Sequence, residues 1–204
     1  PYRRQRQMCI RDRSREEAYM HEGRTGAATI NIVFQRELGR EATQEEIESI
    51  YQEKSVLFNS YTEAERMPGA WELLQKIKNE GLVPMVVTGS GQLSLLERLE
   101  HNFPGMFHKE LMVTAFDVKY GKPNPEPYLM ALKKGGFKPN EALVIENAPL
   151  GVQAGVAAGI FTIAVNTGPL HDNVLLNEGA NLLFHSMPDF NKNWETLQSA
   201  LKQD

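Results

Sequence analysis

Polar side chains follow several short apolar runs in the second half of this chain. Thr88 comes directly after the run PMVV and opens a turn in which Gly89 and Ser90 carry backbone amides toward the next helical segment. A hydroxyl beside exposed amides at a helix start can hold a phosphoryl oxygen. Taken by itself the turn also fits an ordinary capped turn, so the other polar residues of the chain decide its meaning.

Lys122 is the second candidate for phosphate chemistry. It stands in GKPNPEPY, 34 residues after Thr88 and just before a helix start that contains Pro125 and Pro127. Prolines suit a first helical turn because the amides that they lack would have no intrahelical partner. An ammonium held there can neutralise charge on a nucleophilic carboxylate and on a transferring phosphoryl group. The alternative is a solvated surface lysine.

Glu146 and Asn147 end the run ALVI and precede a helix that is rich in small residues. Two oxygen donors at a strand end suit Mg²⁺, which prefers hard ligands and usually keeps water and substrate phosphate in its octahedron. A buried and mutually satisfied polar pair is the alternative. Because asparagine brings a carbonyl oxygen without charge, we expect weaker Mg²⁺ binding unless another carboxylate contributes.

The elements that position these residues are predicted by an alternation of strands and helices. Strands are expected at residues 83–87, 111–115, 142–145 and 161–165, and helices at 70–80 and from near Gln92, Pro125 and Pro149. Such alternation favours βαβ units, a parallel sheet and right-handed crossovers. Ligands of an open parallel sheet gather at the carboxyl ends of its strands. The candidate residues all fall at such ends.

The chain before this region has helical patterning. Thr43 and Glu46 form a T-x-x-E capping box at the start of one helix, and Gly39 ends an earlier one. We therefore predict a small helical bundle over residues 14–67, followed by an α/β domain over residues 68–204.

Composition limits the possible classes of protein. With 204 residues and 41% apolar content, the chain can bury the core of one α/β domain with a small insertion. A net charge of −4 gives no reason to expect a nucleic-acid partner. No apolar run reaches 18 residues, so a membrane span is not expected.

Residues 1–13 differ from the rest of the chain. They contain five of the 22 basic residues, one acidic residue (Asp12) and the only cysteine, Cys9. The string QMCIRDR resembles adapter-derived sequence, so we interpret this segment as a non-native basic tail and leave it out of the fold. Without Cys9 the chain has no disulfide and no cysteine metal site, and a cytoplasmic location is expected.

Three segments together, VVTGSG, YGKPNPEPY and VIENAPLGVQAG, resemble motifs II, III and IV of the haloacid dehalogenase (HAD) superfamily, in its β-phosphoglucomutase-like subgroup. With HEGRTG they are closely similar to bacterial HAD-type inorganic pyrophosphatases over about residues 14–183. The resemblance implies a Rossmann-like parallel sheet with an α-helical cap. It also implies that Glu22 of the cap joins the metal shell and that Arg24 clamps a phosphate. A solvated loop with a surface ion pair is the alternative for both residues.

The reaction that the resemblance implies is in-line attack by an aspartate on phosphorus, followed by hydrolysis of the aspartyl-phosphate. The first motif, an aspartate pair of the form DxD, does not occur in this sequence, and Asp12 is not in that context. We therefore expect the strand that carries the nucleophile to be missing, unpaired strand edges to remain, and turnover by this chain to be negligible. In the subgroup the metal pair is usually Glu-Asp followed by Ser, so Asn147 and Ala148 depart from the pattern.

The prediction is a Mg²⁺-dependent phosphohydrolase, with inorganic pyrophosphate as the favoured substrate of an intact protein that is expected to be a monomer. The alternatives are a β-phosphoglucomutase or sugar-phosphate phosphatase and, in another class, a non-catalytic phosphate-binding protein. A nucleic-acid arm formed by the arginine tail is a third and less favoured class. The predicted site consists of catalytic, substrate-binding and metal-binding residues, in that order: Thr88 and Lys122; Gly89, Ser90 and Arg24; Glu146, Asn147 and Glu22.

Overall fold

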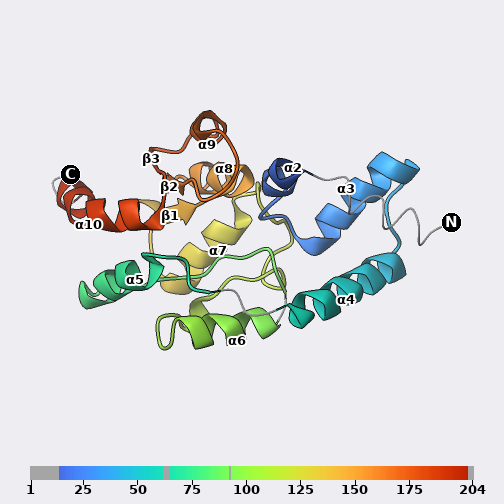
Figure 1. Cartoon of the computed structure of the whole chain (residues 1–204), viewed down its shortest axis with the longest axis horizontal. Helices are drawn as coiled ribbons and strands as arrows, with labels where there is room; N and C mark the ends of the chain where they lie inside the picture. Colours follow the sequence, from blue (N-terminus) through green and yellow to red (C-terminus); the bar gives the residue numbers. More distant parts are fainter. Residues whose placement is uncertain (1–13, 62–64, 92, 202–204) are drawn as a thin grey trace.

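The computed structural model describes residues 14–61, 65–91 and 93–201 (Figure 1). The basic tail, with Cys9 and Asp12, lies outside the described residues. The helices are α2 (Arg15–Met20), α3 (Gly26–Leu38), α4 (Gln44–Ser60), α5 (Ala70–Asn79), α6 (Leu93–Asn102), α7 (Glu126–Gly135), α8 (Pro149–Ala157), α9 (Asp172–Asn177) and α10 (Met187–Leu201). Short 3₁₀ turns, η1 (Lys109–Leu111) and η2 (Pro139–Glu141), precede two of the extended segments.

The sheet consists of parallel strands in the order β1 (Leu143–Glu146), β2 (Phe161–Val165) and β3 (Leu182–Phe184). The small residues of α8 let this helix lie close to the sheet, because a Cβ on Gly155 would come within 2.6 Å of the Thr162 hydroxyl. The predicted α/β class with a Rossmann-like parallel sheet is confirmed.

The core has one layer of helices on each face of the sheet. Alternate residues of β2 point to opposite faces, so Ile163 packs with α5 and α10, whereas Ala164 packs with α8 and α9. Figure 1 shows α5 and α10 side by side at one end of the molecule, with α3 and α4 at the other. Phe190 and Trp194 of α10 are buried in an edge-to-face pair with ring centroids 5.9 Å apart.

The predicted strands at residues 83–87 and 111–115 are wrong. Residues 83–86 have no regular secondary structure, Leu111 ends η1, and Ala115 lies in a turn. The two segments share only one isolated parallel bridge, between Val87 and Val113. Val113 N donates to the Val86 carbonyl at 2.8 Å. Within the described part of the chain, no strand pairs with the outer edge of β1. The 83–87 segment therefore has a partner on one side only, which is too little to hold a continuous ladder.

Helical structure over residues 14–61 agrees with the sequence patterning. The capping box of Thr43 and Glu46 is formed in both directions at the start of α4, and Gly39 ends α3 with a φ of 66°. The boundary between a cap and a core at residue 67 stays a prediction. In the described part of the chain, no helix is both long and apolar enough to cross a membrane.

Candidate active site

All eight residues of the predicted site line one cavity of about 430 Å³. The loop between α2 and α3 forms one wall, helix α4 a second, and the turn after Val87 a third. Lys122 and the end of β1 close the remaining side. The structure thus brings together residues that are separated by up to 125 positions in the chain, from Glu22 to Asn147.

Lys122 is buried, with 7% of its surface exposed. Its Nζ donates to Glu146 Oε1 and, at 3.0 Å, to the Val87 carbonyl, and it lies 4.9 Å from the centroid of the Tyr128 ring. The bond to Val87 gives a hydrogen-bond partner to the carbonyl at the end of the 83–87 segment. A solvated surface lysine is therefore excluded, and the ammonium is held rigidly at the end of β1.

The Glu146 carboxylate is surrounded by donors. Oε1 also accepts from the Tyr128 hydroxyl, and Oε2 accepts from the Asn147 amide at 3.3 Å. Burial, together with the negative charge of Glu146, raises the pKa of Tyr128 well above its usual value, so the phenol stays protonated and donates. The carboxylate lies against Gly151, where a Cβ would come within 2.1 Å of the Glu146 Cδ.

Tyr128 and Gly151 were not identified from the sequence as site residues. Tyr128 is the last residue of GKPNPEPY, and a tyrosine two residues into α7 gives no local sign of a partner 18 positions later. Gly151 was recognised only as one of the small residues of α8. Its contact with Glu146 depends on how the strand end meets the helix, which spacing alone does not reveal.

Glu22 lies at the rim of the cavity with an exposed side chain, in the loop that leads into α3. Partial burial of its carboxyl raises the pKa of Glu22, and the negative charge of Glu146 raises it further. The Lys122 charge and a hydrogen bond from Asn147 act in the opposite direction. Asn147 Nδ2 also lies 3.4 Å from Thr167 Oγ1. Glu22, Glu146 and Asn147 therefore form one electrostatically coupled group.

The turn that contains Thr88 has the geometry of a local cap. Ser90 N donates to Thr88 Oγ1 at 3.1 Å, which leaves the hydroxyl proton available to a ligand. Gly89 packs directly against the backbone of residues 23–24. A Cβ at this position would lie 2.6 Å from the Arg24 carbonyl oxygen. The two loops are thus in backbone contact, and the glycine is required by that approach.

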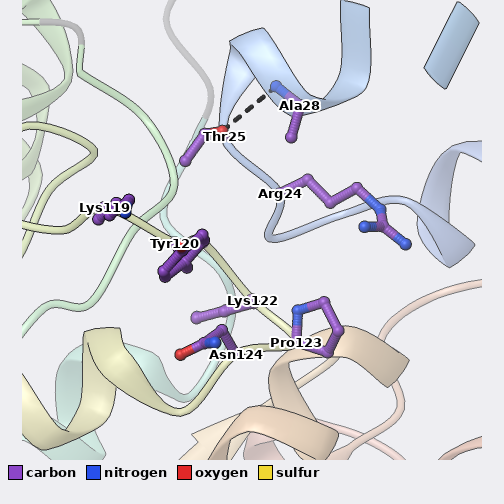
Figure 2. Close-up of a pocket in the computed structure, with 9 residues that line it drawn as sticks. Arg24, Thr25, Ala28, Lys119, Tyr120, Lys122, Pro123 and Asn124 are labelled. Carbon is purple, nitrogen blue, oxygen red and sulfur yellow. Dashed lines mark hydrogen bonds between the residues drawn. The ribbon is translucent and has the colours of Figure 1, made fainter. Parts of the chain in front are cut away.

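Arg24 stands between this cavity and a second one of about 460 Å³. Figure 2 shows the second cavity, where the Arg24 side chain extends away from Lys119 and Tyr120. Thr25 Oγ1 accepts from Ala28 N at 3.3 Å and starts α3, which fixes the backbone beside Arg24 (Figure 2). Nε of Arg24 is buried and has no hydrogen-bond partner. A guanidinium in that state favours an anionic ligand.

The cavity offers Mg²⁺ only a few protein ligands among the described residues. Within the described ranges there is no group of three or more His, Cys, Asp or Glu residues placed to hold a metal. Glu22, Glu146 and Asn147 supply two carboxylates and an amide oxygen, and Mg²⁺ is commonly bound through one or two carboxylates with water and phosphate. Burial is the main cause of the raised pKa of Glu22, and repulsion by the Glu146 carboxylate is the second. A cation bound between the two carboxylates would relieve that repulsion.

Sequence comparison connects the chain to known phosphatases. The family model of haloacid dehalogenase-like hydrolases matches residues 5–165. Hexitol phosphatase A of Escherichia coli is 40% identical over 121 residues, which are 59% of this chain and 54% of that protein. A phosphorylated carbohydrates phosphatase of Thermotoga maritima is 32% identical over 134 residues, 66% of this chain and 58% of that protein. The matched region spans about half the length of these curated relatives.

Solved structures share the fold. A Bacteroides vulgatus protein with a provisional assignment as a beta-phosphoglucomutase is 83% identical, with a TM-score of 0.89 over 93% of this chain and 77% of that one. The beta-phosphoglucomutase of Clostridium difficile has a TM-score of 0.78 over 99% of this chain and 89% of its own, at 20% identity. The second match shows likeness of fold alone.

Proposed function

We propose that this chain, which belongs to the haloacid dehalogenase-like hydrolase family, forms the phosphate-binding and charge-stabilising part of a Mg²⁺-dependent phosphohydrolase. The observation that carries the proposal is the shared cavity of Thr88, Lys122 and the pair Glu146 and Asn147 at the ends of neighbouring chain segments. Of these four residues, the neighbouring cavity of about 460 Å³ is lined by Lys122 alone.

Each side chain has a role that follows from its contacts. The Thr88 hydroxyl and the amides of its turn hold phosphoryl oxygens, and Lys122 neutralises charge beside them. Tyr128 keeps Glu146 in place. Glu22, Glu146 and Asn147 would hold Mg²⁺, which when bound supplies positive charge against the phosphoryl oxygens.

Inorganic pyrophosphate is the favoured substrate. Its support is the carboxylate of Glu22, which a cap loop brings to the end of β1 beside Glu146 and Asn147. An acidic residue at the cavity rim, with a metal bound, suits a small and highly charged substrate better than a neutral sugar ring. A sugar-phosphate phosphatase is the second candidate, because the curated relatives named above act, by their names, on hexitol and carbohydrate phosphates.

The cavity contains no described aspartate that could attack phosphorus. The described aspartates are Asp117, Asp172 and Asp189, and none of them lines the cavity. An aspartate nucleophile would therefore come from outside the described residues. We infer that the described part binds phosphate and stabilises charge, and that turnover requires an aspartate-bearing strand. A non-catalytic phosphate-binding protein is the alternative in another class.

The test compares the present chain with a version that carries an added N-terminal aspartate-bearing strand. Release of phosphate from pyrophosphate and from sugar monophosphates is measured with and without Mg²⁺. The extended version is expected to hydrolyse pyrophosphate only with Mg²⁺, and its Glu22→Ala variant to lose that activity. Unchanged pyrophosphate hydrolysis in the Glu22→Ala variant would remove the main support for the pyrophosphatase assignment.

Two remaining predictions concern the environment of the protein. The cytoplasmic location and the monomeric state of the intact protein stay predictions from the sequence. The expected partner is a small phosphorylated substrate or pyrophosphate, and neither a nucleic acid nor a membrane.

A further inference from the structure

Helix α4 contributes two side chains to the cavity that the sequence did not identify. Tyr51 and Lys54, three positions apart and so on one face of the helix, both line it. Thr88 and Ser90 line the same cavity. The contacts of Tyr51 and Lys54 indicate a role in the choice of substrate.

Tyr51 ties α4 to the phosphate-binding turn. Its hydroxyl accepts from Gly91 N at 3.1 Å, directly after that turn. Its ring lies against the first residue of α3, where a Cβ on Gly26 would come within 2.6 Å of a ring carbon. Tyr51 therefore contacts both segments. Its hydroxyl links α4 to the residue that follows the Thr88 turn.

Lys54 is placed by the same ring, since its Nζ lies 5.7 Å from the Tyr51 ring centroid. No carboxylate of the described residues pairs with this exposed ammonium. The tyrosine thus holds the lysine near the cavity by a cation–π contact instead of an ion pair. Its charge remains available to a ligand.

The cations of the cavity fall into two groups. Lys122 is committed to Glu146 and to the Val87 carbonyl on the core side. Arg24 Nε has no hydrogen-bond partner, and Lys54 has no ion pair with a described carboxylate. These two cations come from the loop before α3 and from α4. An anion that spans the cavity would meet one cationic group at each end.

We propose, on the basis of the phosphohydrolase function above, that Lys54 is a specificity-determining residue that binds the outer phosphate of a diphosphate substrate. The phosphate that is transferred then lies at the Thr88 turn beside Lys122. Tyr51 is a positioning residue that holds Lys54 by its ring. Pyrophosphate carries charge on both of its ends, whereas orthophosphate would engage only the core group, so the two ligands separate the contribution of Lys54.

The test measures binding of pyrophosphate and of orthophosphate to the full chain by isothermal titration calorimetry, which needs no nucleophile. Lys54→Met is expected to weaken pyrophosphate binding about tenfold, because it removes one hydrogen bond to a charged group. Its effect on orthophosphate binding is expected to be less than about twofold. Lys133→Met, an exposed lysine of α7 away from the cavity, controls for the change of net charge. It is expected to leave both affinities unchanged.

Two further variants test the positioning role of Tyr51. Tyr51→Phe keeps the ring and is expected to retain the preference for pyrophosphate, whereas Tyr51→Leu is expected to lose that preference as Lys54→Met does. Thermal unfolding of each variant shows that it is folded. Equal binding of pyrophosphate by wild type and Lys54→Met, or an equal loss for both ligands, overturns the inference alone. Failure of the wild-type chain to bind either ligand overturns the proposed function itself.

Discussion

The Lys122 ammonium and the Glu146 carboxylate form an ion pair in which the side chains are only 7% and 11% exposed. The two residues are 24 positions apart, and the pair joins the loop before α7 to the end of β1. A charge in such a place is costly when its partner is removed, because it loses both water and counter-charge. The pair is thus both the centre of the proposed site and a structural joint of the fold.

The first prediction concerns this ion pair. Lys122→Met should lower the free energy of unfolding by about 3 kcal/mol, since it leaves the Glu146 carboxylate without its cation. Urea denaturation near neutral pH measures the effect. The double variant with Glu146→Gln should recover part of the loss, and Lys133→Met serves as the control. A single variant as stable as wild type would show that the pair contributes little.

A second prediction concerns Gly151. Gly151→Ala places a Cβ within 2.1 Å of the Glu146 Cδ, so the carboxylate has to leave its position and lose its bonds to Lys122 and Tyr128. We expect a loss of about 2 kcal/mol in unfolding free energy. The same substitution in a Glu146→Ala background should cost much less, because the clash is gone. Equal costs in the two backgrounds would contradict the contact.

Stability toward acid is the third prediction. Burial by itself raises the pKa of Asp117, but the hydrogen bond from Lys134 and those from Thr114 outweigh it and hold the pKa below its usual value. A depressed carboxyl pKa contributes stability above the unfolded-state pKa, and this contribution is lost as pH falls through the folded-state pKa.

Asp117→Asn should therefore be less stable than wild type near neutral pH, and the difference should shrink below about pH 4, where the unfolded-state carboxyl is protonated. Chemical denaturation at a series of pH values measures this difference. Glu195→Gln is the matched control, since that carboxylate is 75% exposed in its pair with Lys76. A difference that stays constant with pH would mean that the Asp117 charge is not involved.

The fourth prediction concerns the metal pair. Asn147→Asp adds a carboxylate beside Glu22 and Glu146, so Mg²⁺ binding should tighten by about tenfold. Without Mg²⁺ the same variant should be less stable than wild type, because three carboxylates then repel one another. Thermal unfolding with and without Mg²⁺ gives both effects, with opposite signs. A variant that is destabilised equally in both conditions would contradict a metal site at this position.

Local signals in the sequence were sufficient for the single elements. Thr43 and Glu46 predict the start of α4 and Gly39 the end of α3, because each acts on amides or carbonyls within one turn. The apolar run 161–165 predicts β2 with its observed bounds. The polar residues at strand ends were recognised for a similar reason, since parallel strands direct their carboxyl ends to one edge.

Helix α10 was not predicted, although Phe190, Trp194 and Leu197 follow a helical spacing and are buried. The ladder expected at residues 83–87 did not form, since a strand depends on neighbours that the segment itself does not contain. Both differences lie in contacts between segments that are distant in the chain.

The sequence by itself determined the residue types of the site and the turns that carry them, because these depend on neighbours within a few positions. Only the tertiary structure decided that Lys122 is buried against Glu146, that Tyr128 donates to the same carboxylate, and that α4 brings Lys54 to the cavity. Such contacts arise from the packing of whole elements, where burial and charge pairing across the fold select one arrangement that local spacing leaves open.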